Sequence, residues 1–112
     1  MTFQEYQKKE YGYDCITTFW DDFCIAEKFG GISGVKDTFR RAFKEWKDNY
    51  KYLTELVIVL NHRCWMLHNR GMNELSSVYL NLYEKAHDYA LNNLEGEEFD
   101  YYLSLIHISE PT

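Results

Sequence analysis

The sequence predicts an all-α protein, a small bundle of four to five helices around a central apolar helix at residues 52–69. Apolar side chains recur every three to four residues in several segments, which is the period of one helix face. Strict alternation of apolar and polar residues is absent, and so are Asn-Gly and Asp-Gly hairpin turns. The one proline is Pro111, so no proline interrupts residues 1–102. We therefore expect residues 1–102 to form a single helical domain.

Length, charge and cysteine content limit the classes of protein that fit. A chain of 112 residues with 18% aromatic residues can bury one modest core. The net charge of −6 argues against non-specific binding to nucleic acid or to anionic membranes, and it favours a basic protein partner. Three cysteines without a secretory signal or a membrane-length apolar run indicate reduced thiols. We expect a protein of the bacterial cytoplasm that does not bind membranes.

The N-terminal segment predicts two helices. Thr2 and Glu5 have the Ser/Thr-x-x-Glu spacing of a capping box, in which both side chains pair with free backbone N–H groups. The first helix is short and ends at Gly12. Asp14 is then suited to cap a second helix over residues 15–28, because its carboxylate accepts hydrogen bonds from the first turn.

The glycine pair at residues 30–31 separates the second helix from a third. Ser33 is the expected cap of the third helix, and Asn49 is the expected break before the central helix, although the two helices could continue as one rod. The second and third helices each have an apolar stripe at helical spacing. The stripes are Ile16, Phe19, Trp20, Phe23 and Ala26, and Val35, Phe39, Ala42, Phe43, Trp46 and Tyr50.

The central helix contains the one dense apolar run, residues 56–60, and it is apolar nearly all round in its first half. A helix of that kind belongs in the middle of a bundle. It ends at an Asn-Arg-Gly sequence, after which Asn73 is the expected cap of a fourth helix. Gly96 is expected to end the fourth helix, with a final acidic turn at residues 97–102.

The last ten residues, LSLIHISEPT, differ from the rest of the chain. They contain Pro111 and lack the helical period of the preceding segments. They also resemble the translated read-through of a sequencing adapter, which recurs in metagenomic gene predictions. We therefore expect residues 103–112 to be an adapter-derived tail outside the fold. The alternative is an ordinary apolar strand or tail.

One cluster of metal-ligand residue types occurs, at His62, Cys64 and His68. Cys64 and His68 lie four residues apart and so face the same way on a helix, as zinc ligands often do. A second pair is lacking, because Cys15 and Cys24 would lie on opposite faces of their helix. Cys64 also continues an apolar stripe, where cysteine acts as a small hydrophobic residue. We expect no cofactor, with zinc as the alternative at this pair.

A basic stripe follows the third helix, with steps of four, four, three and four residues. On an acidic protein such a stripe could contact RNA, DNA or an acidic protein surface. The alternative is a solvated face balanced by neighbouring acids. The stripe consists of Lys36, Arg40, Lys44, Lys47 and Lys51.

Two acidic groups lie on the second helix and near the C-terminus. Carboxylates on a rigid helix can imitate phosphates and occupy a nucleic-acid groove lined with Arg and Lys, although many small helical proteins carry such acids. The expected contacts are Asp21, Asp22, Glu27, Glu97 and Glu98. We expect no enzyme, because Asp21 and Asp22 splay apart on a helix and no phosphate loop, nucleophile elbow or dinucleotide fingerprint occurs.

Three segments resemble a family of small proteins encoded by phages and conjugative elements of gut Firmicutes. They are DCITTFWDDFCIAEKFG, VKDTFRRAFKEWKDNYKYLTELVIVLNH and LYEKAHDYALNNLEGEE. The resemblance spans residues 15–98 and stops before the adapter-like tail. It implies an accessory protein that helps a mobile element to survive in its host, and small acidic helical proteins of this kind include anti-CRISPR proteins.

The leading hypothesis is therefore an anti-CRISPR protein that binds a Cas effector, Cas9 of a type II system, and blocks loading of guide or target nucleic acid. Its acidic helix faces would meet an Arg- and Lys-rich surface on that partner. The competing hypothesis is a nucleic-acid-binding or regulatory accessory protein of the element that acts through the basic stripe, residues 36–51.

Overall fold

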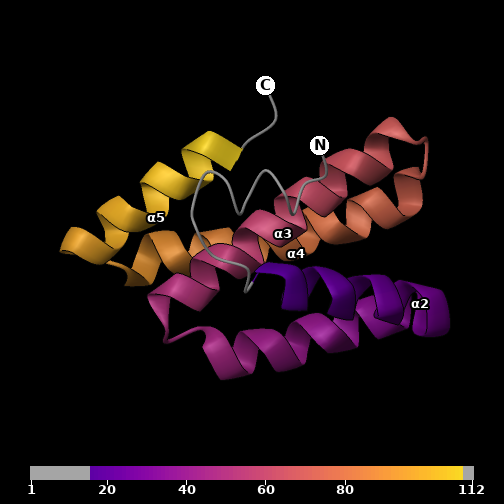
Figure 1. The fold of residues 1–112 in the computed structure, drawn as a ribbon, viewed down its shortest axis with the longest axis horizontal. Helices are drawn as coiled ribbons and strands as arrows, with labels where there is room; N and C mark the ends of the chain where they lie inside the picture. The colour runs from indigo at the N-terminus through magenta and orange to yellow at the C-terminus, as the bar shows by residue number, and fades with distance from the viewer. Residues whose placement is uncertain (1–15, 110–112) are drawn as a thin grey trace.

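The computed structural model describes residues 16–109 and confirms that the protein is all-α: this part of the chain holds four helices and no strand. The helices are α2 (Ile16–Trp46), α3 (Tyr50–Asn69), α4 (Asn73–Asn93) and α5 (Gly96–Ser109). The short N-terminal helix and the Asp14 cap lie outside the described residues. In Figure 1, α3 and α4 run antiparallel, with α2 on one side and α5 on the other.

Helix α2 is divided by a sharp bend at Gly31, whose φ of 59° and ψ of −147° are not helical. A positive φ of this kind is accessible to glycine at little cost. We call residues 16–30 arm 1 and residues 32–46 arm 2. The arms fold back on each other in Figure 1, and a Cβ added to Gly34 would lie only 2.7 Å from the carbonyl oxygen of Ala26. The glycine pair therefore ends the first arm as the sequence predicted.

Helix α3 begins after Asn49, whose side-chain oxygen accepts hydrogen bonds from the backbone N–H groups of Lys51 and Tyr52 at 3.2 and 3.3 Å. This cap explains why the chain turns here instead of continuing from arm 2 as one rod. Every side chain from Leu53 to Leu60 is buried. The buried run is possible because α3 packs against α2, α4 and α5.

Two helices in the C-terminal half of the chain begin differently from the prediction. Asn73 is the first residue of α4, and Met72 precedes it at the cap position without a side-chain hydrogen bond. Gly96, with a φ of 60°, lies at the start of α5. The expected acidic turn is thus the beginning of a 14-residue helix.

Residues 103–109, which we expected to belong to an adapter-derived tail outside the fold, form the last turns of α5. Ile106 is 3% exposed and packs in the core together with Tyr102, which is fully buried. Two apolar side chains four residues apart share one helix face, and that face of α5 lies on α3. The adapter origin of this stretch stays a prediction, but the stretch contributes to the core of this chain.

Candidate functional site

A groove lies between arm 2 and α4, with a volume of about 490 Å³. Four of the five basic-stripe residues line it, and Lys85 of α4 adds a fifth cation from the opposite wall. Lys51 belongs to α3 and does not line the groove. We call this site the basic groove; its cations are Lys36, Arg40, Lys44, Lys47 and Lys85.

The floor of the basic groove is aromatic and rigid. Phe39 is 3% exposed, and its ring stacks on that of Phe43 with centroids 5.3 Å apart. The ring of Phe43 in turn meets the ring of Tyr89 on α4 edge to face, at 5.2 Å. Such contacts hold arm 2 against α4. Lys36, Arg40 and Lys44 therefore lie on a helix that packs against the helix of Lys85, and Lys47 lies in the turn that follows arm 2.

The cations of the groove differ in whether they already interact with a neighbouring side chain of the protein. Arg40 pairs with Asp37 on the same arm, and both side chains are more than half exposed. The ammonium of Lys47 lies 5.8 Å from the ring centre of Tyr89. Lys36, Lys44 and Lys85 have no ion-pair partner among residues 16–109. Three cations are thus available to an anionic ligand without breaking an internal contact.

The predicted acidic contacts do not form one surface. Asp21 and Asp22 are exposed on arm 1, whereas Glu97 and Glu98 are exposed on the first turn of α5. Within the described residues α2 and α5 make no contact with each other. A partner that touches both acidic groups at once would have to span the bundle.

Glu27 is placed differently from the prediction, because it points inward. Its carboxylate accepts hydrogen bonds from Nε and Nη2 of Arg63 on α3, the first at 2.9 Å. The two side chains are 13% and 10% exposed. The centre of the guanidinium also lies 5.2 Å from the ring of Trp20. Glu27 is therefore part of the packing between arm 1 and α3 and not of an exposed acidic face.

The ion pair between Glu27 and Arg63 affects the pKa values of its own groups and of neighbouring side chains. Burial alone would lower the pKa of Arg63, but the hydrogen bonds and charge of Glu27 raise it. Burial raises the pKa of the Tyr79 hydroxyl, and the negative charge of Glu27 raises it further. Burial likewise raises the pKa of the Cys24 thiol, so this cysteine is not activated as a nucleophile.

The candidate metal ligands Cys64 and His68 lie along a second groove, between α3 and α4. The sulfur of Cys64 is half-buried and 3.5 Å from the hydroxyl of Ser76, which donates a hydrogen bond to the Cys64 carbonyl at 2.9 Å. His68 is exposed. Residues 16–109 contain no group of three or more His, Cys, Asp or Glu side chains placed to hold a metal ion.

No protein-family model, curated protein or solved structure matches this chain. No helix within residues 16–109 is long and apolar enough to cross a membrane.

Proposed function

We propose that this protein is a nucleic-acid-binding accessory protein of a phage or conjugative element, and that it binds the phosphate backbone in the basic groove. The main support is that Lys85 of α4 joins the cations of arm 2 around one concave surface. The family resemblance supplies the mobile-element context and a bacterial cytoplasm as the compartment. The proposed role is binding and not catalysis.

The dimensions of the stripe suit a nucleic-acid backbone. From Lys36 to Lys44 the helix rises about 12 Å, at 1.5 Å per residue, and Lys47 follows in the turn after arm 2. Phosphates of one duplex strand follow one another every 3.4 Å along the axis, so the stripe spans several of them. Phe39 is too deeply buried to stack on a base. The groove therefore favours contacts with phosphates, which position a nucleic acid without reading its sequence.

The net charge of −6 opposes this binding over longer distances. Salt screens exposed charges beyond about 10 Å at 0.1 M, so the local cations decide contact while the acidic remainder limits affinity. We therefore expect binding that is moderate and strongly salt-dependent.

The test is fluorescence anisotropy with labelled single-stranded and duplex DNA at 50 and 200 mM salt. Wild-type protein should bind at 50 mM and lose most of its affinity at 200 mM. The pair Lys44→Glu and Lys85→Glu should weaken binding at least tenfold. The control pair Lys28→Glu and Arg70→Glu makes the same change in charge at exposed positions outside the groove and should change affinity less than threefold.

Absence of binding by the wild-type protein would reject nucleic-acid binding. If both charge-reversal pairs weakened DNA binding equally, binding would depend on the total charge, and the basic groove would be rejected as the binding site. Circular dichroism of each variant establishes that the helices are retained.

A second candidate is inhibition of a Cas effector, Cas9, by acidic contacts. Its support is the exposure of Asp21, Asp22, Glu97 and Glu98, together with the family resemblance. A plasmid-interference assay with Cas9 tests it directly. Asp21→Lys with Asp22→Lys should abolish the inhibition, while Lys44→Glu with Lys47→Glu should leave it intact. Full cleavage at saturating wild-type protein would reject this candidate.

A further inference from the structure

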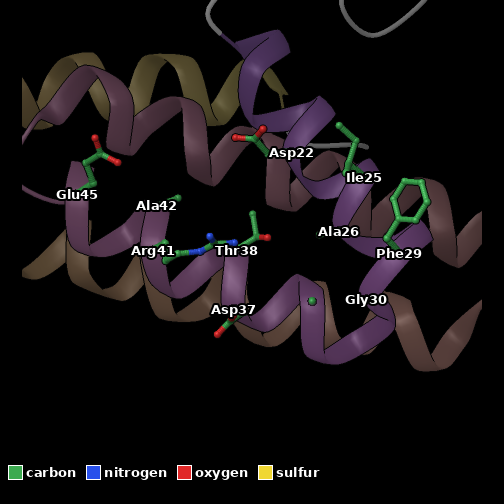
Figure 2. Close-up of a pocket in the computed structure, with 11 residues that line it drawn as sticks. Asp22, Ile25, Ala26, Phe29, Gly30, Asp37, Thr38, Arg41, Ala42 and Glu45 are labelled. Atoms are coloured by element: carbon green, nitrogen blue, oxygen red, sulfur yellow. The ribbon is translucent and has the colours of Figure 1, made fainter.

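A different groove lies between the two arms of α2, with a volume of about 600 Å³. Gly31 reverses the chain, and the absence of a side chain at Gly34 lets the arms approach closely at Ala26. Other small side chains, among them Ala42, also lie between the arms (Figure 2). The result is a shallow channel between the arms that is lined by both apolar and charged side chains.

Two large apolar side chains stand on the arm 1 side of this channel. Ile25 is 57% exposed and Phe29 is 79% exposed. They lie four residues apart and so share one face of arm 1. The ammonium of Lys28, 5.5 Å from the ring centre of Phe29, covers little of that ring. A partner that covers the pair removes their apolar surface from water, which favours binding.

The charges around the channel are mainly negative. Asp22 on arm 1 and Glu45 on arm 2 line it, and Figure 2 shows Glu45 toward one end and Phe29 toward the other. Asp37 also lines the channel and is paired with Arg40, so its charge is compensated. Arg41 is the one cation of the lining. A partner that complements this rim is positively charged.

We infer that the channel between the arms of α2 docks a basic amphipathic helix of a partner protein. An apolar ridge of that helix would cover Ile25 and Phe29, and its Lys or Arg side chains would meet Asp22 and Glu45. Recognition of an amphipathic helix in an apolar groove is a common binding mode, with anchors at i, i+3, i+4 and i+7. An arm of 15 residues is about 22 Å long, which matches four turns of such a partner.

This inference does not depend on nucleic-acid binding. Arm 2 presents one side to arm 1 and another to α4, and the channel and the basic groove share no lining residue. A chain with both sites would hold a nucleic acid on one side and a basic protein helix on the other. A variant of the basic groove, Lys44→Glu with Lys85→Glu, should therefore keep its affinity for the partner helix.

The experiment uses three labelled synthetic peptides of 18 residues. The first has a leucine ridge flanked by lysines, the second has the same ridge flanked by glutamates, and the third has the composition of the first in an order that breaks the ridge. The protein should bind the first peptide at least tenfold more tightly than the other two. Phe29→Ser should weaken that binding at least tenfold, and Asp22→Asn with Glu45→Gln at least threefold.

The matched controls are Leu91→Ser on α4 and Glu97→Gln with Glu98→Gln on α5, since these side chains are exposed but distant from the channel. They should leave the affinity unchanged. The inference is overturned if no peptide binds, if the glutamate peptide binds equally well, or if Phe29→Ser has no effect. Sedimentation of the protein alone would also overturn it if Phe29→Ser abolished a dimer, because the occupant would then be a second copy.

Discussion

Arg63 of α3 donates hydrogen bonds to both carboxylate oxygens of Glu27 on arm 1, across 36 residues of sequence. The two side chains are 10% and 13% exposed, so water screens their interaction only in part. This pair ties arm 1 to α3 beside the ring of Trp20. It is a mostly buried, charged link between these two elements.

Arg63→Met should lower the free energy of unfolding by about 2–4 kcal/mol, because the carboxylate of Glu27 is left poorly solvated and without its partner. The double variant Glu27→Leu with Arg63→Met should cost less than the sum of the two single changes. Urea unfolding followed by circular dichroism measures these values. Arg40→Met serves as the control, since its exposed pair with Asp37 contributes about 0–1 kcal/mol. Strictly additive single changes would contradict the coupling.

Two glycines of α2 should respond to alanine in opposite directions. At Gly34 an added Cβ would lie 2.7 Å from the carbonyl oxygen of Ala26, and a backbone atom cannot move away without separating the arms. Gly34→Ala should therefore destabilise the protein by about 1–3 kcal/mol. Gly30 has a negative φ and open space around it, so Gly30→Ala should stabilise by about 0.4–1 kcal/mol.

Thermal unfolding of the two glycine variants beside the wild type provides the measurement. A lower melting temperature is expected for Gly34→Ala and a higher one for Gly30→Ala. Equal shifts of the same sign would show that the arms are not in contact at Gly34.

The helices were predictable because their signals are local. The stripe from Val35 to Trp46 and the turn at Gly31 depend only on neighbours along the chain. The cap at Asn73 was mispredicted, because Asn is also tolerated inside a helix and nothing local distinguishes the two positions. Residues 103–109 were excluded because they resemble a translated sequencing adapter and lack a clear helical period, yet their burial against α3 is a tertiary effect that no local pattern records.

The sites depend on contacts between distant segments. The spacing of the basic stripe revealed four cations of the basic groove, but Lys85 joins them only through the packing of α4 on arm 2. Glu27 resembled a surface acid because its partner is Arg63, far along the sequence. The sequence did not indicate that Phe29 is exposed, since a phenylalanine at the end of a helix is usually buried. Its exposure follows from the bend at Gly31.

His62 should make the stability of the protein depend on pH. Its ring packs between Trp20 and Trp65, at 5.8 and 5.6 Å between ring centres. Burial, and then the charge of Arg63, lowers its pKa from 6.5 to about 4. Between these values the unfolded chain binds more protons than the folded one, so stability rises with pH over this window. The contribution is complete above pH 6.5 and is lost as the pH falls to 4.

For a partly exposed ring this contribution is about 1–2 kcal/mol after allowance for solvent screening. It is measured as the difference between wild type and His62→Gln, because the carboxylates titrate in both proteins and cancel. The difference in unfolding free energy between the wild type and His62→Gln should be smaller at pH 4 than at pH 7. Parallel profiles would contradict a lowered pKa, as would an NMR titration of the His62 ring with a midpoint near 6.5.

The last prediction concerns the C-terminal helix. Ile106 is 3% exposed, while Leu103, three residues earlier on α5, is 40% exposed. Ile106→Ala should lower the free energy of unfolding by about 2–4 kcal/mol, because it removes buried methyl groups and leaves a cavity against the core. Leu103→Ala should change it by less than about 0.5 kcal/mol. Chemical denaturation of the two variants separates a helix packed on α3 from a tail outside the fold. If residues 103–109 were such a tail, both changes would be equally small.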